Sequence, residues 1–103
     1  MNIVGITSCT VGIAHTYMAR ERLIAAGKKL DIDVKIEAQG SAGVEYQLTA
    51  EDIEKADAVL IASDVVVAGK DRFKGKPLIE VPVAMGIKSP ENLLTQIKTK
   101  LSK

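Results

Sequence analysis

The chain has 103 residues, enough for one hydrophobic core, and we expect a single domain over residues 1–103. Hydrophobic residues make up 47% and charged residues 26%, which is ordinary for a globular protein, and the formal net charge is +1. This charge gives no reason to expect a nucleic acid or an anionic membrane as partner. A single cysteine excludes an internal disulfide framework and a multi-cysteine metal site, and it fits a reducing compartment.

The first 19 residues contain no Asp, Glu, Lys or Arg, a feature they share with signal peptides and membrane spans. However, no basic residues precede the apolar part, and polar residues interrupt it at six positions: Asn2, Thr7, Ser8, Thr10, His15 and Thr16. We therefore expect no targeting segment, no insertion into a membrane and a cytoplasmic location.

The first half of the chain alternates between strand and helix patterns. The apolar run 2–7 predicts a strand that is covered on both faces, and the segment 17–26 predicts a helix. Residues 33–38 alternate between apolar and polar, which predicts a half-exposed strand near a sheet edge that ends in the glycine-containing loop 39–43. Thr49 and the acidic residues after it predict the N-cap of a short helix that ends near Ala56.

The second half continues this alternation. The apolar run 58–62 predicts a central parallel strand. Burial is expected for the three valines 65–67, because adjacent exposed valines would favour aggregation, and the charged segment 70–76 predicts a surface connection. Residues 77–83 predict a strand at the sheet edge, since a proline in it cannot donate to a ladder. Ser89 predicts the N-cap of a last helix, with proline at its first position.

This order of elements predicts an α/β fold, in which a parallel sheet has helices on both faces and right-handed crossovers. In such sheets, ligands bind beyond the carboxyl ends of the strands. The turns after the first three strands share that edge. We therefore expect Cys9 to lie near the loop that contains Gln39 and Ser41 and near the pair Ser63 and Asp64.

Cys9 lies on the turn between the first strand and the first helix. A helix that begins there directs unpaired backbone N–H groups and the positive end of its dipole toward the turn, which suits a phosphate and favours a thiolate. Three interpretations of Cys9 are open: a buried apolar residue, a phosphatase nucleophile, or an acceptor that passes a phosphoryl group on. A cysteine phosphatase needs an arginine after five intervening residues, where this chain has His15, which lacks the bidentate fork of arginine.

The acceptor hypothesis gives the residues after Cys9 a role in binding the phosphoryl group. Backbone N–H groups there could donate to a group that carries about −1.5 to −2 charges. Gly12 permits a close approach of the backbone, and threonine hydroxyls can donate further hydrogen bonds. For His15, a role in starting the helix and a proton-dependent contact to the phosphate are both open. The candidate phosphate-binding residues are Thr10, Val11, Gly12, Ile13, Ala14, His15 and Thr16.

Five segments share a pattern with a known family: 9–19, 37–43, 48–53, 56–64 and 71–76. In their order and spacing they closely resemble the IIB component of the fructose-type family of the bacterial phosphoenolpyruvate-dependent sugar phosphotransferase system. The resemblance implies a three-layer α-β-α fold with a four-stranded parallel sheet in the order 2-1-3-4 and a phosphate-binding loop after the first strand.

The resemblance also implies a transferase that uses no cofactor and no metal. Cys9 would take a phosphoryl group from a phosphohistidine of a IIA domain and deliver it to a fructose-like sugar, which the membrane-embedded IIC component takes up. The chain would associate with the membrane through IIC. A small cysteine-dependent phosphatase and a regulatory binding module on the same fold are the alternatives. Relatives usually have Pro-Thr directly after the cysteine, where this chain has Thr10 and Val11, and this departure indicates a fructose-like paralogue.

Overall fold

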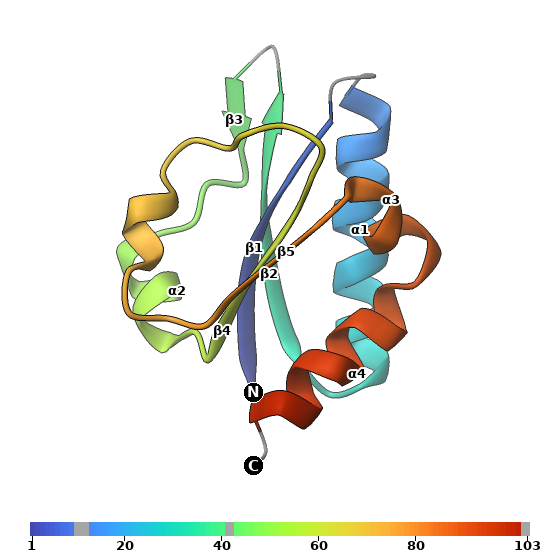
Figure 1. Cartoon of the computed structure of the whole chain (residues 1–103), viewed down its shortest axis with the longest axis vertical. Coiled ribbons are helices and arrows are strands. Elements are labelled where there is room, and N and C mark those ends of the chain that lie inside the picture. The colour runs from blue at the N-terminus through green and yellow to red at the C-terminus, as the bar shows by residue number, and fades with distance from the viewer. Residues whose placement is uncertain (10–12, 41–42, 102–103) are drawn as a thin grey trace.

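The computed structural model describes residues 1–9, 13–40 and 43–101, which form a sheet with helices on both of its faces (Figure 1). In chain order, the elements are β1 (Asn2–Ser8), α1 (Ile13–Lys29), β2 (Asp33–Gly40), β3 (Gly43–Glu45), α2 (Ala50–Lys55), β4 (Ala58–Ser63), the 3-10 helix η1 (Lys70–Phe73), β5 (Leu78–Val81), α3 (Val83–Lys88) and α4 (Pro90–Leu101). No helix in these described ranges is both long enough and apolar enough to cross a bilayer.

The sheet has five strands in the order β3-β2-β1-β4-β5. Strands β2, β1, β4 and β5 are parallel, and this confirms the predicted order 2-1-3-4 for the parallel part of the sheet. The fifth strand, β3, was not predicted. It pairs antiparallel with β2, so that the expected loop 39–43 is instead the end of a hairpin, of which residues 41 and 42 lie outside the described residues.

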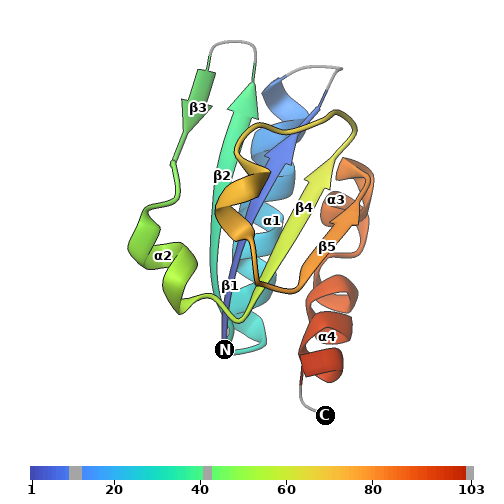
Figure 2. The same cartoon turned by 60° about the vertical axis from the view of Figure 1, so that its left-hand side comes forward.

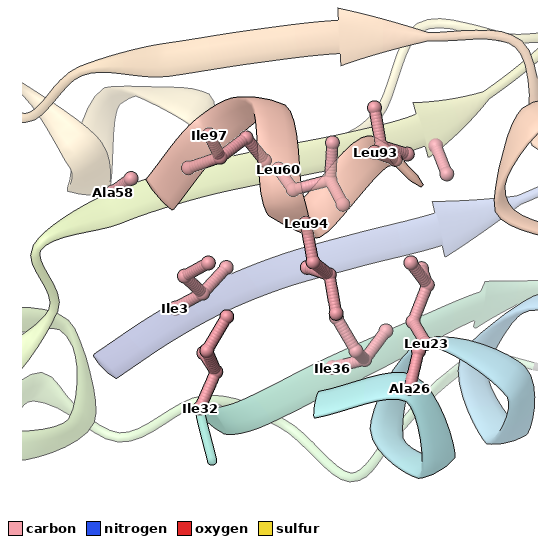
Figure 3. Packing of buried hydrophobic residues seen from close by; sticks show 11 residues of the cluster. Ile3, Leu23, Ala26, Ile32, Ile36, Ala58, Leu60, Leu93, Leu94 and Ile97 are labelled. Carbon is pink, nitrogen blue, oxygen red and sulfur yellow. The ribbon is translucent and has the colours of Figure 1, made fainter. Parts of the chain in front are cut away.

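Helices α1, α3 and α4 cover one face of the sheet, and α2 and η1 cover the other (Figure 1). Figure 3 shows how side chains from α4 meet those of β1 and β4 on the first face. The buried residues of this cluster are Ile3, Leu23, Ala26, Ile32, Ile36, Ala58, Leu60, Ala62, Leu93, Leu94 and Ile97. The second cluster lies under α2 and η1 and comprises Val4, Ile6, Leu48, Ile53, Ala56, Val59, Ile61, Val67 and Phe73.

Two of the predicted element boundaries agree with the structure, and two others differ. Thr49 caps α2 in the predicted way, with a reciprocal pair of hydrogen bonds to Asp52, and α4 begins at Pro90. Helix α1 begins at Ile13, four residues before the predicted segment, so residues 14–16 belong to its first turn. The strand predicted over 77–83 ends at Val81, because Pro82 is the N-cap of α3, a helix that the sequence analysis missed.

The segment after β4 also differs from the prediction. Of the three valines 65–67, Val67 is buried, but Val65 is 37% exposed and Val66 is 93% exposed. The charged segment 70–76, predicted as a surface connection, contains η1, whose Phe73 is inserted into the second cluster. One inserted aromatic side chain thus holds an otherwise charged segment against the sheet.

Candidate functional site

Cys9 lies at the carboxyl edge of the sheet, directly after β1 and before α1. In Figure 2 the arrowheads of the four parallel strands point to this edge, at which α1 begins. The thiol residue is partly exposed, and its neighbours 10–12 lie outside the described residues. At the end of β4, Ser63 pairs with Ser8, and the Asp64 N–H donates a hydrogen bond of 3.3 Å to the Ser8 carbonyl. This pairing places the residue after β4 beside the residue after β1.

Two polar side chains face the sulfur of Cys9. The distance from Cys9 Sγ to Asp64 Oδ2 is 3.6 Å, and the distance to His15 Nδ1 is 3.8 Å. Both lie within the range of hydrogen bonds to sulfur, and the protonated thiol can donate to the carboxylate. The structure therefore brings Asp64 and His15 to Cys9, the first through the predicted sheet topology and the second through the first turn of α1.

A surface pocket of about 320 Å³ opens beside this cluster. Helix α3 supplies apolar side chains and a lysine to its wall, and α1 supplies a methionine. The residues that line the pocket are Cys9, His15, Met18, Asp64, Val83, Ala84, Ile87 and Lys88. The largely apolar wall, next to a thiol at a helix N-terminus, combines a surface for a protein partner with a site for an anion.

The first turn of α1 favours an anion in two ways. It contains no acidic residue, so the positive end of the helix dipole is not neutralised locally. Thr16 is 1% exposed, and its Oγ1 is the one buried side-chain polar atom in the described ranges that has no hydrogen-bond partner. Its backbone is fixed to β1, because the Thr7 hydroxyl donates a hydrogen bond of 3.0 Å to the Thr16 carbonyl. The Thr16 hydroxyl is thus a buried donor on a rigid support.

The other candidates from the sequence divide into those that the structure describes and those that it does not. Thr10, Val11, Gly12 and Ser41 lie outside the described residues, as does the side chain of Ile13, whose backbone begins α1. Ala14 is exposed in the first turn of α1.

Gln39 and Ser63 are described, and both hold the segment that follows β4. The Gln39 amide donates to the Ala68 carbonyl (2.9 Å) and accepts from the Ala68 N–H (3.0 Å). The Ser63 hydroxyl donates to the Val65 carbonyl (2.6 Å) and accepts from the Val65 N–H (3.0 Å). These contacts make Gln39 and Ser63 supports of the loop that carries Asp64.

A buried ion pair supports the same edge, and the sequence analysis did not predict it. Glu37 is 1% exposed, and its two carboxylate oxygens each accept a hydrogen bond of 3.0 Å from the Arg72 guanidinium. Burial alone would raise the pKa of Glu37, but donors from Arg72, Gln39 and the Leu48 N–H outweigh it and lower the pKa below its ordinary value. The polar side of β2 was predicted to be exposed; Asp33 and Lys35 are exposed, but Glu37 is buried, because it binds Arg72 of η1.

Comparison with known proteins identifies the family. Residues 4–96 match the family model described as "PTS system, Lactose/Cellobiose specific IIB subunit". The chain belongs to the PTS IIB family. PTS IIB components are phosphotransferases, and they work with IIA and IIC partners in general.

Several similar relatives of this PTS IIB chain carry fructose-type names, and one, from Escherichia coli (strain K12) and 45% identical over 97 residues, is named "PTS system 2-O-alpha-mannosyl-D-glycerate-specific EIIABC component". The "PTS system fructose-like EIIB component 2" of Escherichia coli (strain K12) is 39% identical over 100 residues, which cover 97% of this chain and 94% of that protein. The "PTS system fructose-specific EIIABC component" of Bacillus subtilis (strain 168) is 44% identical over 92 residues, which cover 89% of this chain but 14% of that protein. This chain therefore spans about a seventh of that relative's length.

The fold of PTS IIB is seen in a solved structure as well. The crystal structure of a predicted fructose-specific IIB from Escherichia coli has a TM-score of 0.90 and 34% identity to this chain, and the match covers 99% of this chain and 90% of that one. The mixed α/β architecture, with the sheet between helices, is therefore that of its IIB structural neighbours.

The arginines of this IIB chain are engaged away from Cys9. Arg20 donates to a carbonyl of β2 (2.9 Å), Arg22 to a carbonyl near the end of α3 (3.1 Å), and Arg72 binds Glu37. All three arginines lie in the described part of the chain, and none lines the pocket beside Cys9. The pocket therefore lacks the planar bidentate phosphate ligand that a cysteine phosphatase needs.

Proposed function

We propose that this chain is the phosphoryl carrier of a sugar phosphotransferase system. Cys9 accepts a phosphoryl group from a phosphohistidine of a fructose-type IIA domain, and it donates the group to a fructose-like sugar that the membrane component IIC takes up. The observation that carries this proposal is the position of Cys9 at the N-terminus of α1, with His15 Nδ1 and Asp64 Oδ2 within 3.8 Å of its sulfur. The fructose-type names of the relatives support the class of sugar.

The chemistry requires a nucleophile, a site for the phosphoryl oxygens and a surface for two successive partners. The sulfur supplies the nucleophile. The backbone N–H groups and the Thr16 hydroxyl in the first turn of α1 are proposed donors to the phosphoryl oxygens, aided by the helix dipole. Such transfer depends mainly on positioning and on stabilising charge, so few further groups are needed.

The partners would dock at the carboxyl edge of the sheet. Met18, which lines the pocket, is 39% exposed; Met85 in α3 is 41% exposed, and Val66 in the loop after β4 is 93% exposed. Flexible methionines and an exposed valine suit a surface that must bind two different proteins in turn. The sequence analysis expected this valine to be buried, and its exposure supports a docking role.

Besides a regulatory binding module, the sequence left open a phosphatase function. It is disfavoured by the arginines, all of which bind other groups. A carrier has to hold its phosphoryl group without hydrolysing it, and a pocket without a bidentate arginine is compatible with that requirement.

The test is incubation with a fructose-type IIA that has been phosphorylated from phosphoenolpyruvate, followed by intact mass measurement. The wild type is expected to gain one phosphoryl group, and the Cys9→Ala variant none. Thr95→Ala is a control that should gain one phosphoryl group like the wild type, because it removes an exposed hydroxyl from α4, which does not line the pocket beside Cys9. A wild type that gains no phosphoryl group, or a Cys9→Ala variant that gains one, would overturn the proposal.

A further inference from the structure

Asp64 is fixed beside the sulfur of Cys9 through two anchors. Its backbone N–H donates to the Ser8 carbonyl (3.3 Å), and its side-chain Oδ1 accepts a hydrogen bond from the Val83 N–H (3.3 Å). Val83 is the first residue of α3, where a carboxylate also meets the favourable end of the helix dipole. These anchors hold the other oxygen, Oδ2, 3.6 Å from Cys9 Sγ. The carboxylate is therefore part of the wall of the pocket.

We propose that Asp64 is a catalytic residue that keeps the phosphoryl group on Cys9 transferable, because it favours the thiol over phosphocysteine. This inference rests on the proposed carrier function of Cys9. In the thiol state, the S–H group donates to Oδ2 of the carboxylate. In phosphocysteine the sulfur has no proton, and the phosphoryl group adds about −1.5 to −2 charges beside the carboxylate. An attraction in one state is thus replaced by a repulsion in the other.

In both transfer steps one bond to phosphorus forms as another breaks, and one proton moves the opposite way. When Cys9 accepts, the S–P bond forms and the N–P bond of the donor breaks; the bonding pair stays on the donor nitrogen, and the thiol proton neutralises it. When Cys9 donates, the S–P bond breaks with its pair on sulfur, an O–P bond forms at a sugar hydroxyl, and the hydroxyl proton passes to sulfur. The second step restores the hydrogen bond to Asp64. Asp64 therefore opposes the first step and favours the second.

Other groups in the pocket act in the opposite direction. Lys88 lines it with a cationic side chain, and His15 Nδ1 lies 3.8 Å from the sulfur. Together with the N-terminus of α1, these groups attract a phosphoryl group. Asp64 offsets part of this attraction, which would otherwise make phosphocysteine too stable to serve as a donor.

The Asp64→Asn variant isolates the charge, because an asparagine keeps the shape of the side chain and an oxygen that can accept from the Val83 N–H. The assay mixes equimolar phosphorylated fructose-type IIA with the chain and measures the ratio of phosphocysteine to thiol at equilibrium by intact mass. We expect the equilibrium constant of the transfer to rise about tenfold in Asp64→Asn, because Coulomb repulsion across roughly 4 Å of solvated protein is removed. In an equimolar mixture the ratio is the square root of that constant, so it should rise about threefold. Since about 1 M salt screens charges beyond roughly 3 Å, it should reduce the difference between the ratios of the wild type and Asp64→Asn.

Asp71→Asn is the matched control, because it makes the same chemical change at an exposed residue of η1 that does not line the pocket. It should keep the wild-type ratio. Asp64→Ala removes the α3 contact as well as the charge and should share the raised ratio while it lowers stability. Equal ratios in wild type and Asp64→Asn would overturn the role of Asp64. No phosphocysteine in any variant would instead overturn the carrier function itself.

Discussion

Replacing Arg72 by alanine would leave Glu37 as a carboxylate inside the protein without its cationic partner. Glu37 is 1% exposed, and Arg72 donates one hydrogen bond of 3.0 Å to each of its oxygens. Removal of one partner of a buried ion pair costs about 3–5 kcal/mol, because the remaining charge stays desolvated. The Gln39 amide and the Leu48 N–H still donate to the carboxylate. We therefore expect Arg72→Ala to lower the free energy of unfolding by about 3 kcal/mol, the low end of that range.

The pH dependence of this loss distinguishes a buried charge from lost packing. In the wild type, burial opposes ionisation of Glu37, but the donors around it outweigh burial and lower its pKa. Such a group adds stability above its unfolded pKa of about 4.3, and this contribution is lost as the pH falls through the lowered value. In Arg72→Ala the strongest donor is gone, so burial raises the pKa and protonation relieves the buried charge. The deficit of the variant relative to wild type should therefore shrink as the pH falls from neutral toward about 4.3.

Urea denaturation followed by far-UV circular dichroism measures this loss, since the chain has no tryptophan to report it by fluorescence. The double variant Glu37→Gln with Arg72→Ala removes both charges and should recover part of the stability. Lys74→Ala is the control, because it removes an exposed cation two positions after Arg72 and should change stability by less than about 0.5 kcal/mol. If Arg72→Ala lowers the free energy of unfolding by less than about 1 kcal/mol, or if its deficit does not depend on pH, the buried charge of Glu37 is not its cause.

Two further predictions concern acid stability and sheet packing. Hydrogen bonds from Lys35 and from the backbone and hydroxyl of Thr49 lower the pKa of Asp52 to about 2, so its stabilising contribution is present above an unfolded pKa of about 3.9 and is lost as the pH falls toward 2. Thermal melts between neutral pH and pH 2 should therefore show a shallower acid dependence in Asp52→Asn, and identical profiles would contradict this assignment. In Gly5→Ala, the new Cβ would lie 2.1 Å from the Leu60 carbonyl oxygen, so we expect a loss of several kcal/mol or no folding; an unchanged melting temperature would contradict so close an approach of β1 and β4.

The parallel sheet could be predicted because its strands are short apolar runs separated by helical patterns. Ala58, Val59, Leu60 and Ile61 are all buried, as expected for a strand that helices cover on both faces. The rule that ligands bind beyond the carboxyl ends of parallel strands then placed Asp64 near Cys9, and the structure gives 3.6 Å between the two side chains. Both the burial of β4 and the proximity of Asp64 to Cys9 follow from the order of the strands in the sheet. They could therefore be predicted without knowledge of any side-chain contact.

The elements that could not be predicted are short or depend on distant contacts. Strand β3 has three residues, all exposed, so its sequence carries no burial pattern. Helix α3 has six residues, and its start at Pro82 looks the same as the end of an edge strand. Glu37 follows the polar alternation of β2 but is buried, because Phe73 and Arg72 bring η1 over that face. The burial of such a polar residue depends on tertiary packing, which the alternation of apolar and polar residues along one strand does not indicate.

The position of site residues could be predicted where it follows from the strand order, but their side-chain contacts could not. The sequence left open whether His15 starts the helix or contacts the phosphate; its Nδ1 lies 3.8 Å from the sulfur, because α1 begins at Ile13 and holds His15 in its first turn. Gln39 was placed at the correct edge, but its amide binds Ala68 through two hydrogen bonds. Its partner is a backbone segment of a different loop, and sequence alone gives no signal for such a contact.

The fate of a phosphoryl group on Cys9 distinguishes a phosphoryl carrier from a hydrolase. The phosphorylated chain is separated from its donor and divided between buffer alone and membranes that contain a fructose-type IIC together with fructose. If Cys9 is a carrier, sugar phosphate appears as phosphocysteine is lost in the membrane sample, and little inorganic phosphate is released in buffer. Release of inorganic phosphate at the same rate in both samples, without any sugar phosphate, would contradict the carrier function and favour a hydrolase.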